Sequence, residues 1–205
     1  DIELNGQHQD IKALRGSVLL TKLSMASMHS KLLGENLIFT QHFSAHKKGA
    51  EWLWKMTSAL LAGDLYIEPV YLEVGKAPLT LNANGLWLAG QKIININSMQ
   101  LAHFNTSLFQ GTALLNYQTG LMFESVDFSI SLPELQVAAP IYLKPFLETG
   151  IFEGISLAGR ADARLTIAQN NVTGISVGFE HLRLDDTQQQ FYLDDAFAHI
   201  NWAAH

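Results

Sequence analysis

Apolar and polar residues alternate in run after run along this chain of 205 residues. In the clearest run, residues 125–132, a serine or an aspartate separates each apolar residue from the next: Val126, Phe128, Ile130 and Leu132. Successive side chains of a β-strand point to opposite faces, so this pattern predicts a strand with one dry and one wet face.

The same alternation predicts strands over most of the chain. Three are expected before about residue 43, and the second, after Gly16, changes phase between Leu20 and Leu23, as a β-bulge would cause. A similar change of phase is expected between Phe179 and Leu182, in a strand that also contains Ile175 and Val177. Further strands are expected around residues 65–74, 79–101, 113–132, 163–184 and 191–202.

Two segments are predicted to depart from this pattern by forming helices. Residues 51–61 lack glycine and proline, and Leu53, Met56 and Leu60 recur at helical intervals. A short helix is expected over residues 142–148, inside the connection of residues 138–152. Asn84-Gly85, between alternating segments, predicts a hairpin turn, and Pro133 is expected to end the strand of residues 125–132.

These elements predict a mainly β fold: a large curved antiparallel sheet or an open β-sandwich with an apolar concave face, plus one or two short helices. No low-complexity linker divides residues 1–205, which we therefore treat as a single β-rich domain. The chain starts without a methionine and ends just after an apparent strand, so we expect a segment of a longer protein with its signal or anchor elsewhere.

Composition excludes several classes of function. A net charge of -6 with scattered lysines and arginines argues against nucleic acid, because a phosphate backbone requires clustered basic residues. The absence of cysteine excludes disulfides and thiolate metal sites. No apolar run reaches the roughly 20 residues that span a bilayer. Only 16% of residues are charged, which leaves much apolar surface for each charge.

No cluster of residues predicts catalysis or metal binding, so we expect no enzyme and no cofactor. His42 and His46 are four apart but lack a third ligand, and they are interpreted as surface histidines, as are His103, His181 and His199. The neighbouring aspartates at 185–186 and 194–195 lack the ordered spacing of a calcium loop and are interpreted as solvated turn residues. A hydrolase whose triad assembles only in three dimensions stays open.

The apolar face itself is then the candidate site. One interpretation is that it fills the inside of a β-sandwich, as in most all-β domains. The other is that a single curled sheet leaves an open trough for acyl chains, where each buried methylene contributes about 0.8 kcal/mol without any polar contact. The residues predicted to line such a groove are Val126, Phe128, Ile130, Leu132, Ile175, Val177 and Phe179.

Several short segments in residues 60–202 are similar to a known group of proteins. They read GDLYIEPVYL from Gly63, PLTLNANG from Pro78, IYLKPFL from Ile141, LAGRA from Leu157 and FYLDD from Phe191, followed by Trp202. This order resembles the C-terminal regions of AsmA-like envelope proteins of Gram-negative bacteria, the superfamily that includes the TamB, YhdP and YdbH types.

The resemblance implies a periplasmic protein anchored in the inner membrane, in which long curved β-sheets form a hydrophobic groove that conducts phospholipid. It supplies no catalytic residues, and the helix predicted at residues 51–61 would interrupt a continuous groove. The leading hypothesis is a non-enzymatic module that binds phospholipid or another acyl-chain ligand. The alternative is a β-sandwich interaction or scaffold domain in a cell-envelope assembly, with protein partners at its edge strands.

Overall fold

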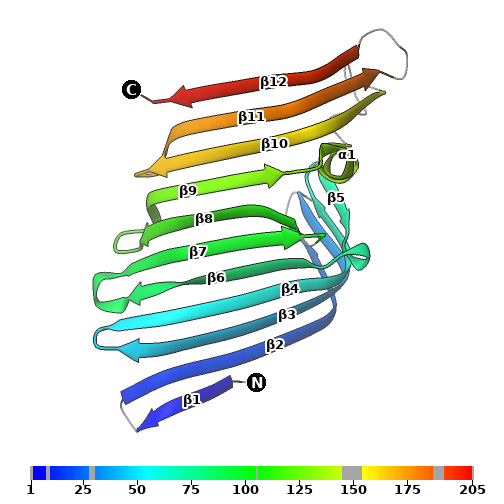
Figure 1. Ribbon diagram of the computed structural model, residues 1–205. Helices are drawn as coiled ribbons and strands as arrows, with labels where there is room; N and C mark the ends of the chain where they lie inside the picture. The colour runs from blue at the N-terminus through cyan, green and yellow to red at the C-terminus, as the bar shows by residue number, and fades with distance from the viewer. Residues whose placement is uncertain are drawn as a thin grey trace.

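The chain forms one open antiparallel sheet (Figure 1). The computed structural model describes residues 2–7, 10–27, 31–104, 106–144, 154–186 and 192–204. The strands are β1 (Ile2–Gln7), β2 (Asp10–Ala26), β3 (Leu32–Lys48), β4 (Glu51–Ile67), β5 (Val70–Glu73), β6 (Leu79–Leu88), β7 (Ile93–His103), β8 (Thr106–Asn116), β9 (Met122–Leu132), β10 (Ile155–Ala168), β11 (Asn171–Asp186) and β12 (Tyr192–Ala203).

Chain order and spatial order nearly coincide. The sheet runs β1-β2-β3-β4-β6-β7-β8-β9-β10-β11-β12, and β5 pairs with β4 beside this path. The part of the chain that the structure describes has four short helical turns between strands: η1 (Val74–Lys76), η2 (Ala89–Gln91), α1 (Leu135–Ala138) and η3, a π-helical turn (Ala139–Leu143). The predicted mainly β fold with a large antiparallel sheet is therefore confirmed. No helix in the described ranges has the length and hydropathy needed to cross a membrane.

The helix predicted at residues 51–61 is wrong, because this segment is the first part of β4. It pairs with β3 along one edge and with β6 along the other, and Trp52, Trp54 and Met56 alternate onto one face of the sheet. A helix here would leave the facing edges of β3 and β6 unpaired, whereas the strand satisfies these backbone groups. The helical spacing of Leu53, Met56 and Leu60 is a by-product of a segment rich in apolar residues.

The hairpin predicted at Asn84-Gly85 is also wrong, because β6 runs through both residues. A register irregularity lies between them, and a Cβ added to Gly85 would lie 1.9 Å from the Asn95 carbonyl oxygen and 2.9 Å from the Trp54 ring. Gly85 therefore permits a close approach of neighbouring groups inside a strand. Such an approach, like a turn, is a common reason for glycine in an alternating segment.

The short helix predicted at residues 142–148 lies mostly outside the described residues. In the described part, helical structure begins earlier, at Leu135, and continues through Leu143. The end of β9 at Leu132, directly before Pro133, agrees with the prediction.

Two creases bend the sheet where irregular residues lie side by side in adjacent strands. In the first, Lys22 of β2, Asn36 of β3 and Gly63 of β4 all have positive φ, and the register shifts beside them. The ends of these strands beyond the crease bend away from the main sheet (Figure 1). Aligned bulges of this kind add local twist and bend to a strand.

The bent ends enclose a small core. Its buried residues are Leu37, Leu65, Leu72 and Val74, and it also includes Leu60, Ile141 and Tyr142 at its margin.

The second crease contains Gly159 of β10, His181 of β11 and Asp195 of β12, which again have positive φ. The phase changes predicted in β2 and in β11 are confirmed at these two creases.

Candidate functional site

The pairing register collects apolar side chains on one face of the sheet. In the middle of β8 to β12, rows of paired residues contain only apolar residues and glycine; one such row contains Gly111, Phe128, Leu165, Ile175 and Trp202. Paired residues share a face of the sheet, so these rows form one continuous surface, which we call the apolar face.

All seven predicted groove residues belong to this face, on two strands separated by β10. The register joins the two strands through β10: Leu165 lies opposite Phe128 and Ile175, and Ala163 lies opposite Ile130 and Val177. In the same way, Ala161 lies opposite both Leu132 and Phe179, beside the register irregularity of β11. Phe179 also borders a hollow on the opposite face of the sheet.

The apolar residues of β10, β12 and β4 also belong to this face, but they were not predicted from the sequence to line a groove. In β10 they are Ala161, Ala163, Leu165 and Ile167, and in β12 they are Ala198, Ile200 and Trp202. Their alternation was visible in the sequence, but alternation alone does not reveal which strands are neighbours.

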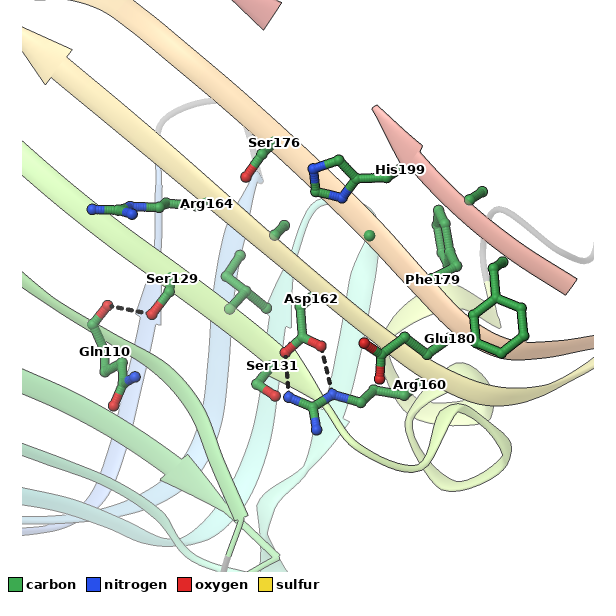
Figure 2. A pocket seen from close by; sticks show the side chains of 15 residues that line it. Gln110, Ser129, Ser131, Arg160, Asp162, Arg164, Ser176, Phe179, Glu180 and His199 are labelled. Carbon is green, nitrogen blue, oxygen red and sulfur yellow. Dashed lines mark hydrogen bonds and ion pairs between the residues drawn. The ribbon is translucent and has the colours of Figure 1, made fainter. Parts of the chain in front are cut away.

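Much of the apolar face is open to solvent. Ile130 and Ile175 are each 44% exposed and Ile200 is 63% exposed, although Val126 is 4% exposed because its neighbours crowd it. Figure 2 shows the polar side chains of β8–β12 standing on the other face, with β2–β4 passing behind these strands. The apolar face therefore lies on the concave side of the curved sheet.

The polar face has a shallow hollow of about 690 Å³ over β8–β12 (Figure 2). Arg160 Nε lies 2.5 Å from Asp162 Oδ2, and Arg164 forms a bidentate pair with Asp127, with Nε 2.8 Å from Oδ1. The guanidinium of each pair lowers the pKa of its carboxyl partner. Both arginines are thus neutralised by carboxylates, and surface pairs of this kind contribute little to stability because water screens them.

The polar face also carries a histidine–aspartate pair. His181 Nδ1 lies 2.6 Å from Asp195 Oδ1, and the ring of Phe197 is 4.8 Å from the His181 ring. The side chains of His181 and Asp195 are 72% and 68% exposed, so water screens this pair on the second crease. His42, His46 and His199 are exposed, in agreement with the sequence interpretation.

The prediction that His103 lies on the surface is wrong. Its side chain is buried, with 3% of the residue's area exposed. Its Nε2 lies 3.0 Å from the Ala77 carbonyl oxygen, and its Nδ1 is hydrogen-bonded to the Tyr142 hydroxyl. Burial lowers the pKa of His103 and raises that of Tyr142 to about 12. His103 therefore connects the end of β7 to η1 and η3, and polar partners rather than solvent satisfy its ring.

A second correction concerns the aspartates interpreted as solvated. Asp185 and the pair at 194–195 are exposed, but Asp186 is buried at the end of β11. No group of three histidine, aspartate or glutamate side chains is arranged to hold a metal ion in the described ranges.

No protein family, curated protein or solved structure was found to match the chain. The geometry of the sheet is therefore what bears on function. The apolar face is exposed over much of β8–β12, whereas the titratable groups of the polar face described above are paired with one another or exposed to water.

Proposed function

We propose that this chain is a non-enzymatic module that binds the acyl chains of phospholipids on its concave apolar face and conducts them across the strands. The observation that carries this proposal is the uncovered apolar surface of β8–β12, where the central rows of paired residues contain only apolar residues and glycine. An acyl chain can cover such a surface without hydrogen bonds, whereas a typical protein interface contains about one hydrogen bond per 100–200 Å².

The energetics favour exchange over permanent storage. A chain of about 16 methylenes would gain about 13 kcal/mol if fully buried, and about half of that on a face open on one side. Association itself costs about 4 kcal/mol or more, which leaves only a few kcal/mol of net binding. A ligand held this weakly can leave again, as a conducting surface requires.

The shape of the face supports movement along it. Eleven described strands lie side by side, and a spacing of about 4.8 Å gives the sheet a width of about 48 Å. Apolar residues repeat from strand to strand, so an acyl chain meets similar contacts at each step. The resemblance to AsmA-like proteins supports placing this module in the periplasm, as part of a protein anchored in the inner membrane.

The test is native mass spectrometry of the purified chain followed by lipid extraction. The ring of Phe128 packs 4.5 Å from that of Phe109 and lies over Gly111, so replacing Phe128 would also damage packing. Ile175→Asp is the better variant because Ile175 is half exposed, and Ser176→Asp places the same charge on the polar face.

We expect phospholipid to co-purify with the wild type and with Ser176→Asp, and to be reduced at least fivefold in Ile175→Asp. Far-UV circular dichroism would check that both variants fold. A lipid-free wild type that also fails to take up added phospholipid or an apolar dye would contradict the proposal. That result would favour the scaffold alternative, in which a protein partner covers the apolar face.

A further inference from the structure

Three of the four tryptophans gather at one place on the apolar face. Trp52 and Trp54 of β4 and Trp87 of β6 line a cavity of about 380 Å³ near the turns that join β3 to β4 and β6 to β7. The remaining lining residues are all apolar: Ile11, Leu14, Phe43, Ala45 and Ile94. The fourth tryptophan, Trp202, lies on β12 at the far edge of the same face.

The register explains why a cavity forms here. Trp54 lies between Ala45 of β3 and Gly85 of β6, and its ring lies close to Gly85, where a larger residue would clash with it. Trp52 and Trp87 lie opposite each other with their ring centroids 6.4 Å apart, and Trp87 Nε1 donates to the Tyr117 hydroxyl at 2.7 Å. Aromatic walls around small residues thus form a concave apolar pocket of the kind that holds small ligands.

The pocket offers no polar group to a ligand. Trp54 Nε1 has no hydrogen-bond partner in the described part of the chain, but it is buried and does not face the cavity. Apolar contacts alone would therefore hold a ligand inside the pocket, and any preference for charge must come from the residues around it.

The turns beside the pocket are basic, although the whole chain is acidic. Lys47 lies directly opposite Trp52, Lys92 lies in the β6–β7 turn two residues before Ile94, and both lysines are exposed. Lys48 lies opposite Glu51, the acidic residue of the β3–β4 turn. Since the chain has a net charge of -6, these lysines form a local exception.

We propose that the tryptophan pocket is the subsite that receives an anionic acyl lipid, such as a lysophospholipid or phospholipid with a negative head group. Its acyl chain enters the apolar pocket, and its phosphate lies near Lys47 and Lys92. This inference rests on the proposed function. It adds where on the apolar face the lipid first binds and that a negatively charged head group is preferred.

Bromine quenches tryptophan fluorescence on contact, so brominated lipids can report which tryptophan they reach. The probes are two lysophospholipids with the same brominated stearoyl chain, one with a phosphoglycerol and one with a phosphocholine head group, both below their micelle concentrations. Trp202→Phe keeps the pocket tryptophans, and the triple variant Trp52→Phe/Trp54→Phe/Trp87→Phe keeps only Trp202. These two reporters are separated by seven strand steps, or about 34 Å.

We expect half-quenching of the pocket tryptophans at a concentration of the anionic probe at least fivefold lower than for Trp202. The anionic probe should act at least threefold more strongly than the phosphocholine probe, and added salt should reduce that ratio. Lys47→Glu/Lys92→Glu should abolish the ratio. Lys31→Glu/Lys76→Glu changes the net charge equally and should preserve it, because these lysines are paired with Glu68 and Glu73 elsewhere.

Three results would overturn the subsite. Equal quenching of Trp202 and the pocket tryptophans would leave a uniform lipid-binding face, which contradicts the subsite but retains the proposed function. Equal response to both head groups would contradict the role of the lysines. Quenching of neither reporter in folded protein would contradict the subsite and the proposed function together. If the triple variant does not fold, subtracting the Trp202→Phe emission from the wild type isolates the Trp202 signal.

Discussion

At the residue scale, the most informative side chain is that of His103, whose burial could not be predicted from the sequence. His103 lies in a polar position of its alternating segment, and nothing in the local pattern distinguishes it from an exposed histidine. Its burial follows from the approach of Ala77, directly after η1, and of Tyr142 in η3, which lie 26 and 39 residues away in the chain. Contacts at that distance along the chain cannot be predicted from the residues around position 103.

The burial of His103 predicts a loss of stability in mild acid. Because its pKa is lowered in the folded chain, the unfolded state binds more protons below the ordinary histidine pKa of about 6.5. The free energy of unfolding should therefore decrease as the pH falls from 7 toward the lowered pKa. Urea unfolding at pH 7.5 and pH 5 measures this decrease.

His103→Phe should reduce this pH dependence, and His42→Asn, at an exposed histidine, should leave it unchanged. An equal pH dependence in the wild type and His103→Phe would show that other groups cause the loss of stability in acid.

At the element scale, strands rather than helices were predicted for most of the chain, and the error at residues 51–61 concerned one strand. The creases explain how long strands cover a core at one end of the sheet. Their positive φ values fall on lysine, asparagine, histidine and aspartate as well as on glycine. The sequence therefore revealed them only as changes of phase in β2 and β11.

Gly63 should be among the least replaceable residues of the first crease. Its φ is +105°, and an added Cβ would lie 2.6 Å from the Glu35 carbonyl oxygen. Gly63→Ala should lower the free energy of unfolding by about 2–3 kcal/mol, because the strained conformation and the backbone clash act together.

Gly90→Ala is the matched control, since nothing lies within 4 Å of its added Cβ, and it should change stability by less than about 0.5 kcal/mol. Urea unfolding of both variants measures the difference. Similar values for the two would mean that the crease relaxes around a Cβ.

At the scale of the whole molecule, the sheet has two free edges. Among the described strands, β1 and β12 each pair on one side only, and nearly all described side chains of β12 are exposed. Unpaired strand edges recruit further strands unless charge or proline protects them. The same edges would extend the apolar face if another strand were added.

We expect the chain to associate in a concentration-dependent manner through β12. His199→Lys/Asn201→Lys places two charges on the edge strand and should weaken association at least threefold. Ser98→Lys/Gln100→Lys places two charges on the same polar face of a central strand and should not. Sedimentation velocity over a range of concentrations measures the difference, and equal association of the two variants would indicate contact through a face rather than an edge.

The sequence by itself determined which side chains share a face, because the direction of a side chain along a strand is a local property with a period of two. The mainly β fold and the grouping of Val126, Phe128, Ile130 and Leu132 on one side followed from that property alone. Only the tertiary structure decided that residues 51–61 form a strand, that β10 joins the two predicted lining strands and that His103 is buried. Those features depend on pairing between distant segments, where backbone hydrogen bonds from both neighbours outweigh the preference of a short stretch.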